Sequence, residues 1–336
     1  MYKLFRKIWS KGERELTERE NLKLVFDHSK TPEWIPYMFN CYNFIIPTEV
    51  IADRPPFGVM EGDDWFGCHW IFDEKIFGFA QDPKVPVPCT DITKWKEQVK
   101  FPDLDAIDWE GLCAPIVASY DPDRMTQLML QCGIFERVHA LCGFEDTLIA
   151  MYEEPEAFYD LMEAVTDFRI EAIRRAVKYL KPDLVTNMDD YGTQSGPIMS
   201  PEMFREHILP HAIRLGKAIN EMGVIYQHHT CGKFDVLMPD MIKMGMQSIT
   251  AVSPVNDVDM LIREYGDRLV FDGCMNNQQI LDYPGCTEEM ARAEARRAMD
   301  KFGPGGNYVA GGYCVKPMEE AVGREVMTYG KTFYKK

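Results

Sequence analysis

A histidine and a cysteine stand two residues apart in QHHTCGK, residues 227–233, at the end of a predicted buried strand. In an extended chain, residues i and i+2 project from the same face at a separation of roughly 7 Å, so His229 and Cys231 can share one metal ion. His228 then faces the opposite way. Imidazole and thiolate are zinc ligands, and a catalytic zinc takes three protein ligands and keeps one position open. A buried histidine beside an inert thiol fits the same spacing, because cysteine is among the most buried residue types.

Two further cysteines end later strands of the predicted sheet. Cys274 closes RLVFDGC, and Cys314 follows NYVAGGY. Since the carboxyl ends of parallel strands meet at one face of such a fold, both cysteines are candidates for the third ligand. The sequence therefore predicts a metal site that draws on three strands.

Three acidic residues follow strands and could handle protons or position a ligand. Asp189 and Asp190 are adjacent, so we expect one to face the site as ligand, base or orienter and the other to cap a helix or turn. Capping alone would explain both. Glu136 is a candidate acid, and a structural ion pair with Arg137 is its alternative interpretation.

An aromatic run, DDWFGCHW, could form the wall of a substrate pocket. We take Trp65 and His69 from this run, and Gln194 at the end of NMDDYGTQ, as candidate substrate-binding residues. A satellite hydrophobic cluster explains the aromatic run equally well.

Short apolar runs alternate with amphipathic segments after residue 120, which indicates a parallel sheet covered on both faces. The predicted strands are WIPYMF, MTQLMLQ, DLVTNM, VIYQHH, SITAVS, RLVFDGC and NYVAGGY. We predict an α/β fold, a (β/α)8 TIM barrel, whose working residues lie at the carboxyl ends of the strands. A doubly wound sheet is the second choice, since no G-x-G-x-x-G follows a strand.

The chain is expected to be a single domain over residues 1–336. Residues 1–30 are predicted to be an N-terminal helical extension, with a capping box formed by Thr17 and Glu20. Residues 43–120 are predicted to be an irregular insertion after the first strand, because they contain little periodic apolar sequence.

The composition narrows the class of partner. The formal net charge is −16, from 53 acidic and 37 basic residues, and no basic block could follow a phosphate backbone, so nucleic acid is not an expected partner. Ten scattered cysteines without an export signal indicate reduced thiols in a cytoplasm. No apolar run is long enough for a membrane span.

Several motifs, taken in order, resemble the uroporphyrinogen decarboxylase superfamily. They are GIFERVHALCGFEDTLIAMYEEPE, NMDDYGTQSGPIMSPEMFREHILP, YQHHTCGKFDVLMPDMIKMG, VFDGCMNNQQIL and YVAGGYC. The resemblance implies a (β/α)8 barrel with its site in the barrel mouth. The decarboxylases carry an arginine-rich segment after the first strand, and WIPYMFNCYNFIIP contains no arginine. A tetra-anionic porphyrinogen is therefore a poor electrostatic match to this chain.

The corrinoid-linked zinc methyltransferases of the superfamily are the better match. Their pattern of H-x-C and a later cysteine implies that His229, Cys231 and Cys314 bind Zn²⁺, and Cys274 is extra to that pattern. The resemblance implies a small-molecule methyl donor and a corrinoid (cobalamin) protein as partner.

Two half-reactions stay open at this stage. We favour methyl transfer from a methyl ether, preferably an aryl one, to cobalt(I), over transfer from methylcobamide to a thiol or tetrahydrofolate. A metal-independent decarboxylase that uses Asp189 or Asp190 is a further alternative, and a non-catalytic corrinoid or ligand carrier is another.

Overall fold

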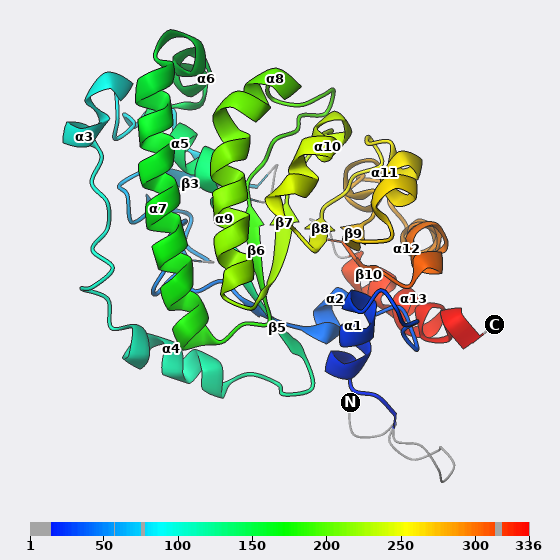
Figure 1. Cartoon of the computed structure of the whole chain (residues 1–336). Helices are drawn as coiled ribbons and strands as arrows, with labels where there is room; N and C mark the ends of the chain where they lie inside the picture. The colour runs from blue at the N-terminus through cyan, green and yellow to red at the C-terminus, as the bar shows by residue number, and fades with distance from the viewer. Residues whose placement is uncertain (1–14, 57, 75–77, 313–317, 336) are drawn as a thin grey trace.

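Seven parallel strands form the central sheet of the protein in this computed structural model, which describes residues 15–56, 58–74, 78–312 and 318–335 (Figure 1). Neighbouring strands follow the order β1-β5-β6-β7-β8-β9-β10. Their bounds are β1 Tyr42–Ile45, β5 Met125–Leu130, β6 Leu184–Met188, β7 Ile225–His229, β8 Ser248–Thr250, β9 Val270–Cys274 and β10 Tyr308–Gly311. The sheet curls and the helices surround it, which confirms the α/β barrel-like fold.

The segment before β1 brings the two edges of the sheet together. Tyr37 forms a parallel bridge with Ala310 of β10, and the Ala310 N–H donates to the Pro36 carbonyl over 2.9 Å. The prediction that WIPYMF is the first strand is wrong. Pro36 has no N–H to extend a ladder, and Met38–Cys41 turns into the short helix α2, so the first strand begins only at Tyr42.

Helices cover the outside of the sheet, with the long α7 and α9 packed side by side (Figure 1). The remaining bounds are α1 Glu18–Phe26, α3 Trp95–Gln98, α4 Trp109–Ala118, α5 Ile134–Cys142, α6 Phe144–Glu153, α7 Pro155–Leu180, α8 Pro201–Met203, α9 Leu209–Glu221, α10 Met238–Met241, α11 Val258–Tyr265, α12 Glu288–Phe302 and α13 Glu319–Thr328. Thr17 and Glu20 form the predicted capping box of α1. The sequence reading omitted α5, which begins directly after β5.

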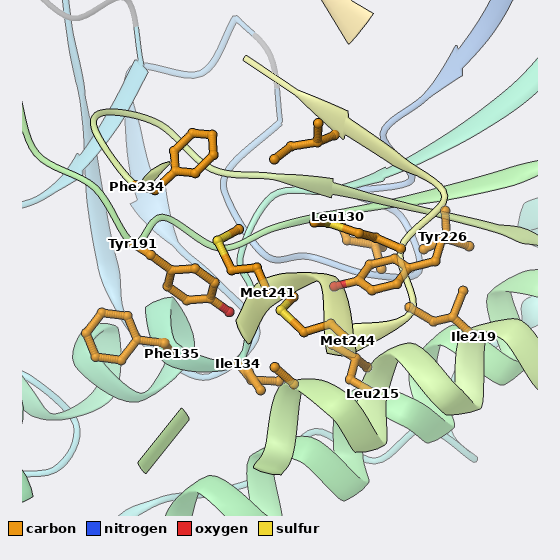
Figure 2. Packing of buried hydrophobic residues seen from close by; sticks show 14 of the residues in the cluster. Leu130, Ile134, Phe135, Tyr191, Leu215, Ile219, Tyr226, Phe234, Met241 and Met244 are labelled. Atoms are coloured by element: carbon orange, nitrogen blue, oxygen red, sulfur yellow. The ribbon is translucent and has the colours of Figure 1, made fainter. Parts of the chain in front are cut away.

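A continuous hydrophobic layer lies between the strands and the outer helices. Figure 2 shows Ile134 and Phe135 of α5, Leu215 and Ile219 of α9, and Tyr226 of β7 meeting in this layer, where all five are at most 1% exposed. Burial on this scale fixes the helices against the sheet, and so fixes the loops that join them at the strand ends.

The inside of the barrel holds a polar layer, and a hydrophobic cluster lies at the amino-terminal ends of β5, β6, β9 and β10. The Gln227 amide donates to Asp272 over 2.9 Å and to Ser248 over 2.9 Å, and Gln127 donates to Gln227 over 2.7 Å. The Tyr42 hydroxyl donates to Asp272 over 3.1 Å. Gln227 precedes His229 by two residues, so this layer lies directly beneath the strand end that carries the metal-ligand candidates.

The region between β1 and β5 is more regular than the predicted insertion. It contains a separate antiparallel sheet of β2 Glu61–Asp63, β3 His69–Asp73 and β4 Gly78–Gln81. Two buried arginines hold it to the barrel: Arg137 of α5 bonds Asp64 and lies 3.5 Å from Asp53, and Arg169 of α7 pairs with Asp53 over 2.9 Å. These ion pairs act together with buried apolar side chains of the region, such as Trp70, that belong to the main hydrophobic core.

Nine of the ten cysteines lie in described segments, and no disulfide joins any two of these nine. Within those same segments, none of the helices combines the length and apolarity needed to cross a membrane.

Candidate metal centre

His228 and His229 face opposite sides of β7, as the strand alternation predicted. The His228 ring is fully buried among the outer helices, where it stacks on Tyr191 at 5.2 Å between ring centroids and lies 3.1 Å from the Tyr226 hydroxyl. Burial lowers the pKa of His228 to about 3, so this ring stays neutral. His229 points into the barrel mouth.

His229 lies close to two other side chains, Asp190 and Cys231, and the three residues come from two strand ends. The Nε2 atom of His229 lies 3.4 Å from the Cys231 sulfur and 3.9 Å from the Asp190 carboxylate. One possible ligand atom from each of Asp190, His229 and Cys231 lies within 4.8 Å of the other two. The Cys231 N–H also donates to Asp190 over 2.7 Å, which ties the β6 and β7 ends together.

This arrangement fits zinc in its donor atoms and in its spacing. Zinc–nitrogen, zinc–oxygen and zinc–sulfur bonds of about 2.0 to 2.3 Å place tetrahedral ligands roughly 3.3 to 3.8 Å apart. The measured separations of 3.4 and 3.9 Å are close to that range. A nitrogen, a sulfur and a carboxylate oxygen supply three ligands and leave one position open for a substrate.

The electrostatics of the cluster also favour a cation. Burial lowers the pKa of His229, which keeps the ring in its neutral, ligating form. Although the Cys231 residue is exposed, its sulfur lies among protein atoms, and this desolvation and the nearby Asp190 raise the pKa of the thiol. A bound divalent cation would reverse that tendency and stabilise the thiolate beside the carboxylate.

Asp189 takes the capping role that was expected of one of the two aspartates. Its carboxylate accepts from the backbone N–H groups of Ile134, Phe135 and Glu136 over 3.1, 3.2 and 2.9 Å, at the N-terminus of α5. The Tyr191 hydroxyl donates to it over 3.0 Å. Complete burial raises the pKa of Asp189 to about 6, against the effect of these hydrogen bonds.

The Asp189 cap positions Glu136 near the cluster. Burial, and then the negative charge of Asp190, raise the pKa of Glu136 well above its ordinary value. The Arg54 guanidinium lies 3.6 Å from Glu136 and stacks on the Trp70 ring, 3.4 Å from its centroid. A buried carboxyl with a raised pKa and a cation therefore lie beside the three candidate ligands.

The three predicted substrate-binding residues lie in two segments, the region between β1 and β5 and the loop after β6. Trp65 packs edge-on against Phe66 and Phe168 of α7, at the edge of the main hydrophobic core. His69 pairs with Asp63 over 2.6 Å in the β2-β3-β4 sheet. Gln194 is exposed in the loop after β6.

Of the two remaining cysteine candidates, Cys274 lies among the described residues and Cys314 does not. Cys274 is buried, and its thiol lies 3.5 Å from the Asp272 carbonyl, so the structure does not bring it into the cluster. It lines a cavity of about 120 Å³ with Cys231, Ala251 and Gly311. Both Ala251 and Cys274 have positive φ, of 66° and 61°, an uncommon backbone conformation for residues with a side chain. Cys314 lies outside the described residues.

Sequence reasoning missed Arg54 as a site residue because it placed the first strand too early. With β1 at Tyr42–Ile45, the segment after the first strand continues into IADRPP and includes Arg54. Trp70 was visible in the aromatic run, but only the fold shows that it supports an arginine next to Glu136.

Comparisons with known proteins agree with this fold. The family model for uroporphyrinogen decarboxylase (URO-D) matches residues 88–319. Methylcobamide:CoM methyltransferase MtaA of Methanosarcina barkeri is 25% identical over 162 residues, which are 47% of this chain and 45% of that protein, so less than half of that relative is matched. A solved methyltransferase structure from Methanosarcina mazei superposes with a TM-score of 0.70 at 14% identity, over 96% of this chain and all of that one, and shows the same fold.

Proposed function

The chain belongs to the uroporphyrinogen decarboxylase family, and from that premise we propose that it is a zinc-dependent methyltransferase that moves the methyl group of a methyl ether to the cobalt(I) of a corrinoid protein. The observation that carries the proposal is the cluster of Asp190, His229 and Cys231, whose ligand atoms lie within 4.8 Å of one another. The cluster lies at the carboxyl ends of β6 and β7, where barrel enzymes place their chemistry.

The three cluster residues would hold the metal. Bound zinc supplies Lewis acidity to the ether oxygen, so that an alkoxide or phenoxide becomes an acceptable leaving group. Neutral His229 and the Cys231 thiolate are the first two ligands. Asp190 is the third, and Cys314 remains a proposed ligand that would replace the carboxylate, so that one position stays open for the ether oxygen.

Glu136 favours the ether half-reaction. A departing alkoxide needs a proton, and burial together with the negative charge of Asp190 raises the pKa of Glu136, which favours its protonated form more than in an ordinary glutamate. A thiol substrate has the opposite need, because it must lose its proton to become a nucleophile. We therefore assign Glu136 as the acid that protonates the leaving oxygen.

Methyl transfer from a methylcobamide to a thiol or tetrahydrofolate is the second candidate. The relative from Methanosarcina barkeri is named as a methylcobamide:CoM methyltransferase, and this name favours the thiol direction. Trp65 packs against Phe168 and His69 pairs with Asp63, and neither contact bears on whether the ether is aryl. Arg54 does not make porphyrinogen decarboxylation a better candidate, because the positive charge of one guanidinium beside Glu136 cannot offset the negative charge of four carboxylates.

The proposal is tested by following cob(I)alamin methylation, by its change in visible spectrum, with a panel of methyl ethers and methylated thiols. The zinc-loaded protein should demethylate an ether, and Cys231→Ala should lose both zinc and turnover. Cys286→Ala, a partly exposed cysteine away from the cluster, is the matched control and should keep both. Full activity of a metal-free protein would refute the proposal.

A further inference from the structure

The loops that follow β6 and β7 stay bonded to each other beyond the ends of the two strands. The Asp189 N–H donates to the His229 carbonyl over 3.0 Å, and the Lys233 N–H donates to the Thr193 carbonyl over 2.7 Å. Thr193 and Lys233 also form an isolated antiparallel bridge. Cys231 lies in sequence between the two contacts of the β7 loop, so this part of the candidate metal site is held on both sides.

Thr230 makes the central contact between the two loops. It stands between His229 and Cys231 in the sequence, and it is fully buried. Its hydroxyl oxygen accepts from the Tyr191 N–H over 2.8 Å, and Tyr191 directly follows Asp190. One side-chain hydrogen bond therefore joins the residue between two candidate ligands to the residue next to the third.

Two glycines allow the backbones of the loops to touch. A Cβ atom on Gly192 would lie 2.5 Å from the Cys231 carbonyl oxygen and 2.7 Å from the Lys233 nitrogen. Gly232 has a φ of 76°, and a Cβ atom there would lie 2.4 Å from the carbonyl carbon of Gly192. Neither position has room for a side chain, so the close approach is built into the sequence.

A third loop holds the turn that follows Cys231. Asn256, between β8 and α11, is 5% exposed, and its amide nitrogen donates to the Gly232 carbonyl over 2.9 Å. Its amide oxygen accepts from the N–H groups of Phe234 and Asp235 over 2.8 and 3.0 Å. The turn is thus fixed from the side of β8 as well as from the side of β6.

We propose that Thr230 is a positioning residue, which keeps the three candidate ligands assembled before any metal binds. The inference rests on the proposed function, since it concerns how the metal site of that function is held. Ordering two loops costs conformational entropy, and here protein hydrogen bonds offset that cost during folding instead of the metal at binding. Thr230→Val keeps the shape of the side chain and removes the acceptor, which leaves the buried Tyr191 N–H without its partner.

Hydrogen exchange in the metal-free wild-type protein tests the assembled state directly. The N–H groups of Tyr191, Cys231 and Lys233 should exchange at least roughly 100-fold more slowly than in an unfolded peptide, and added zinc should slow them little further. Exchange that is fast without metal and becomes slow only when zinc is added would overturn the inference. This measurement needs no variant, so a folding defect in Thr230→Val leaves it decisive.

Cobalt(II) titrations, followed by visible absorption, test the role of the hydroxyl, and competition with zinc gives the zinc affinity. Thr230→Val should lower both affinities roughly tenfold or more and weaken the absorption bands of four-coordinate cobalt, whereas Thr230→Ser should restore both. Thr166→Val is the matched control, because it removes the hydrogen bond of another fully buried threonine, 2.7 Å from the Met162 carbonyl within α7. The control should leave affinity and spectrum unchanged.

Wild-type cobalt and zinc affinities in Thr230→Val would also overturn the inference. Slow exchange in a metal-free protein that binds neither cobalt nor zinc has a different meaning. That result would refute the proposed zinc-dependent reaction and would keep the assembled loops.

Discussion

Asp189 and Asp190 are neighbours in sequence with separable roles. Asp189→Asn should weaken the α5 cap, since an amide cannot accept from three N–H groups as a carboxylate does, and should cost about 2 kcal/mol of unfolding free energy. Asp190→Asn should leave stability nearly unchanged and lower zinc affinity roughly 10- to 100-fold. Thermal melts and zinc titrations of both variants check this, and the same defect in both would contradict the assignment.

Asp272 is a buried acid whose pKa burial raises to about 6 from an ordinary 3.8. The folded protein therefore binds a proton that the unfolded chain has lost between pH 4 and 6, and stability falls as pH rises through this window. The difference between the two pKa values corresponds to about 3 kcal/mol of unfolding free energy, and this stabilisation is lost in full above pH 6. Asp272→Asn removes this term, so denaturant melts should show the variant gaining stability relative to wild type from pH 4 to pH 8. A constant difference would contradict it.

At the level of residues, the pattern H-x-C gave enough information to place His229 with Cys231 and to turn His228 away, because strand alternation is a local rule. The same rule left open which aspartate caps and which ligates. That choice depends on the position of α5, a helix that the sequence reading did not include. The packing of the aromatic run could not be foreseen for a similar reason: Trp65 contacts Phe168, more than 90 residues further along the chain.

Between elements, Gly216 allows α9 to approach the turn that contains Met244. A Cβ atom there would lie 1.9 Å from the Met244 carbonyl oxygen and 2.9 Å from the Tyr226 ring. Gly216→Ala should therefore destabilise the fold by about 2 kcal/mol or more, although alanine is the better helix former. Gly196→Ala, with nothing within 4 Å of its added Cβ, is the control and should change stability little. Equal denaturation midpoints for the two variants would contradict this packing.

The alternating strands and helices after residue 120 were readable from the sequence because each is a contiguous apolar or amphipathic run. The first strand could not be read in this way, because WIPYMF is as apolar as a strand. Only its proline and the single bridge between Tyr37 and Ala310 show that this segment is too short to be a strand. The β2-β3-β4 sheet was also unreadable, because its strands are at most five residues long and buried ion pairs hold the region in place.

At the scale of the whole molecule, the barrel brings together residues that lie far apart in the sequence. Arg54 and Glu136 meet beside Asp190, His229 and Cys231 only because β1, β5, β6 and β7 are adjacent in one sheet. The family match covers most of these residues, but Arg54 lies before residue 88, where it begins. The candidate metal cluster thus lies within the region that the family model matches, and Arg54 lies before that region.

Zinc K-edge X-ray absorption of the metal-loaded protein tests the central claim most directly, because it counts the ligand types at the metal. A site built from Asp190, His229 and Cys231 predicts about one zinc per chain with at least one sulfur at roughly 2.3 Å and nitrogen or oxygen at roughly 2.0 to 2.2 Å. The sulfur contribution should fall in Cys231→Ser. A zinc shell without sulfur, or a spectrum unchanged in Cys231→Ser, would contradict the proposed metal centre.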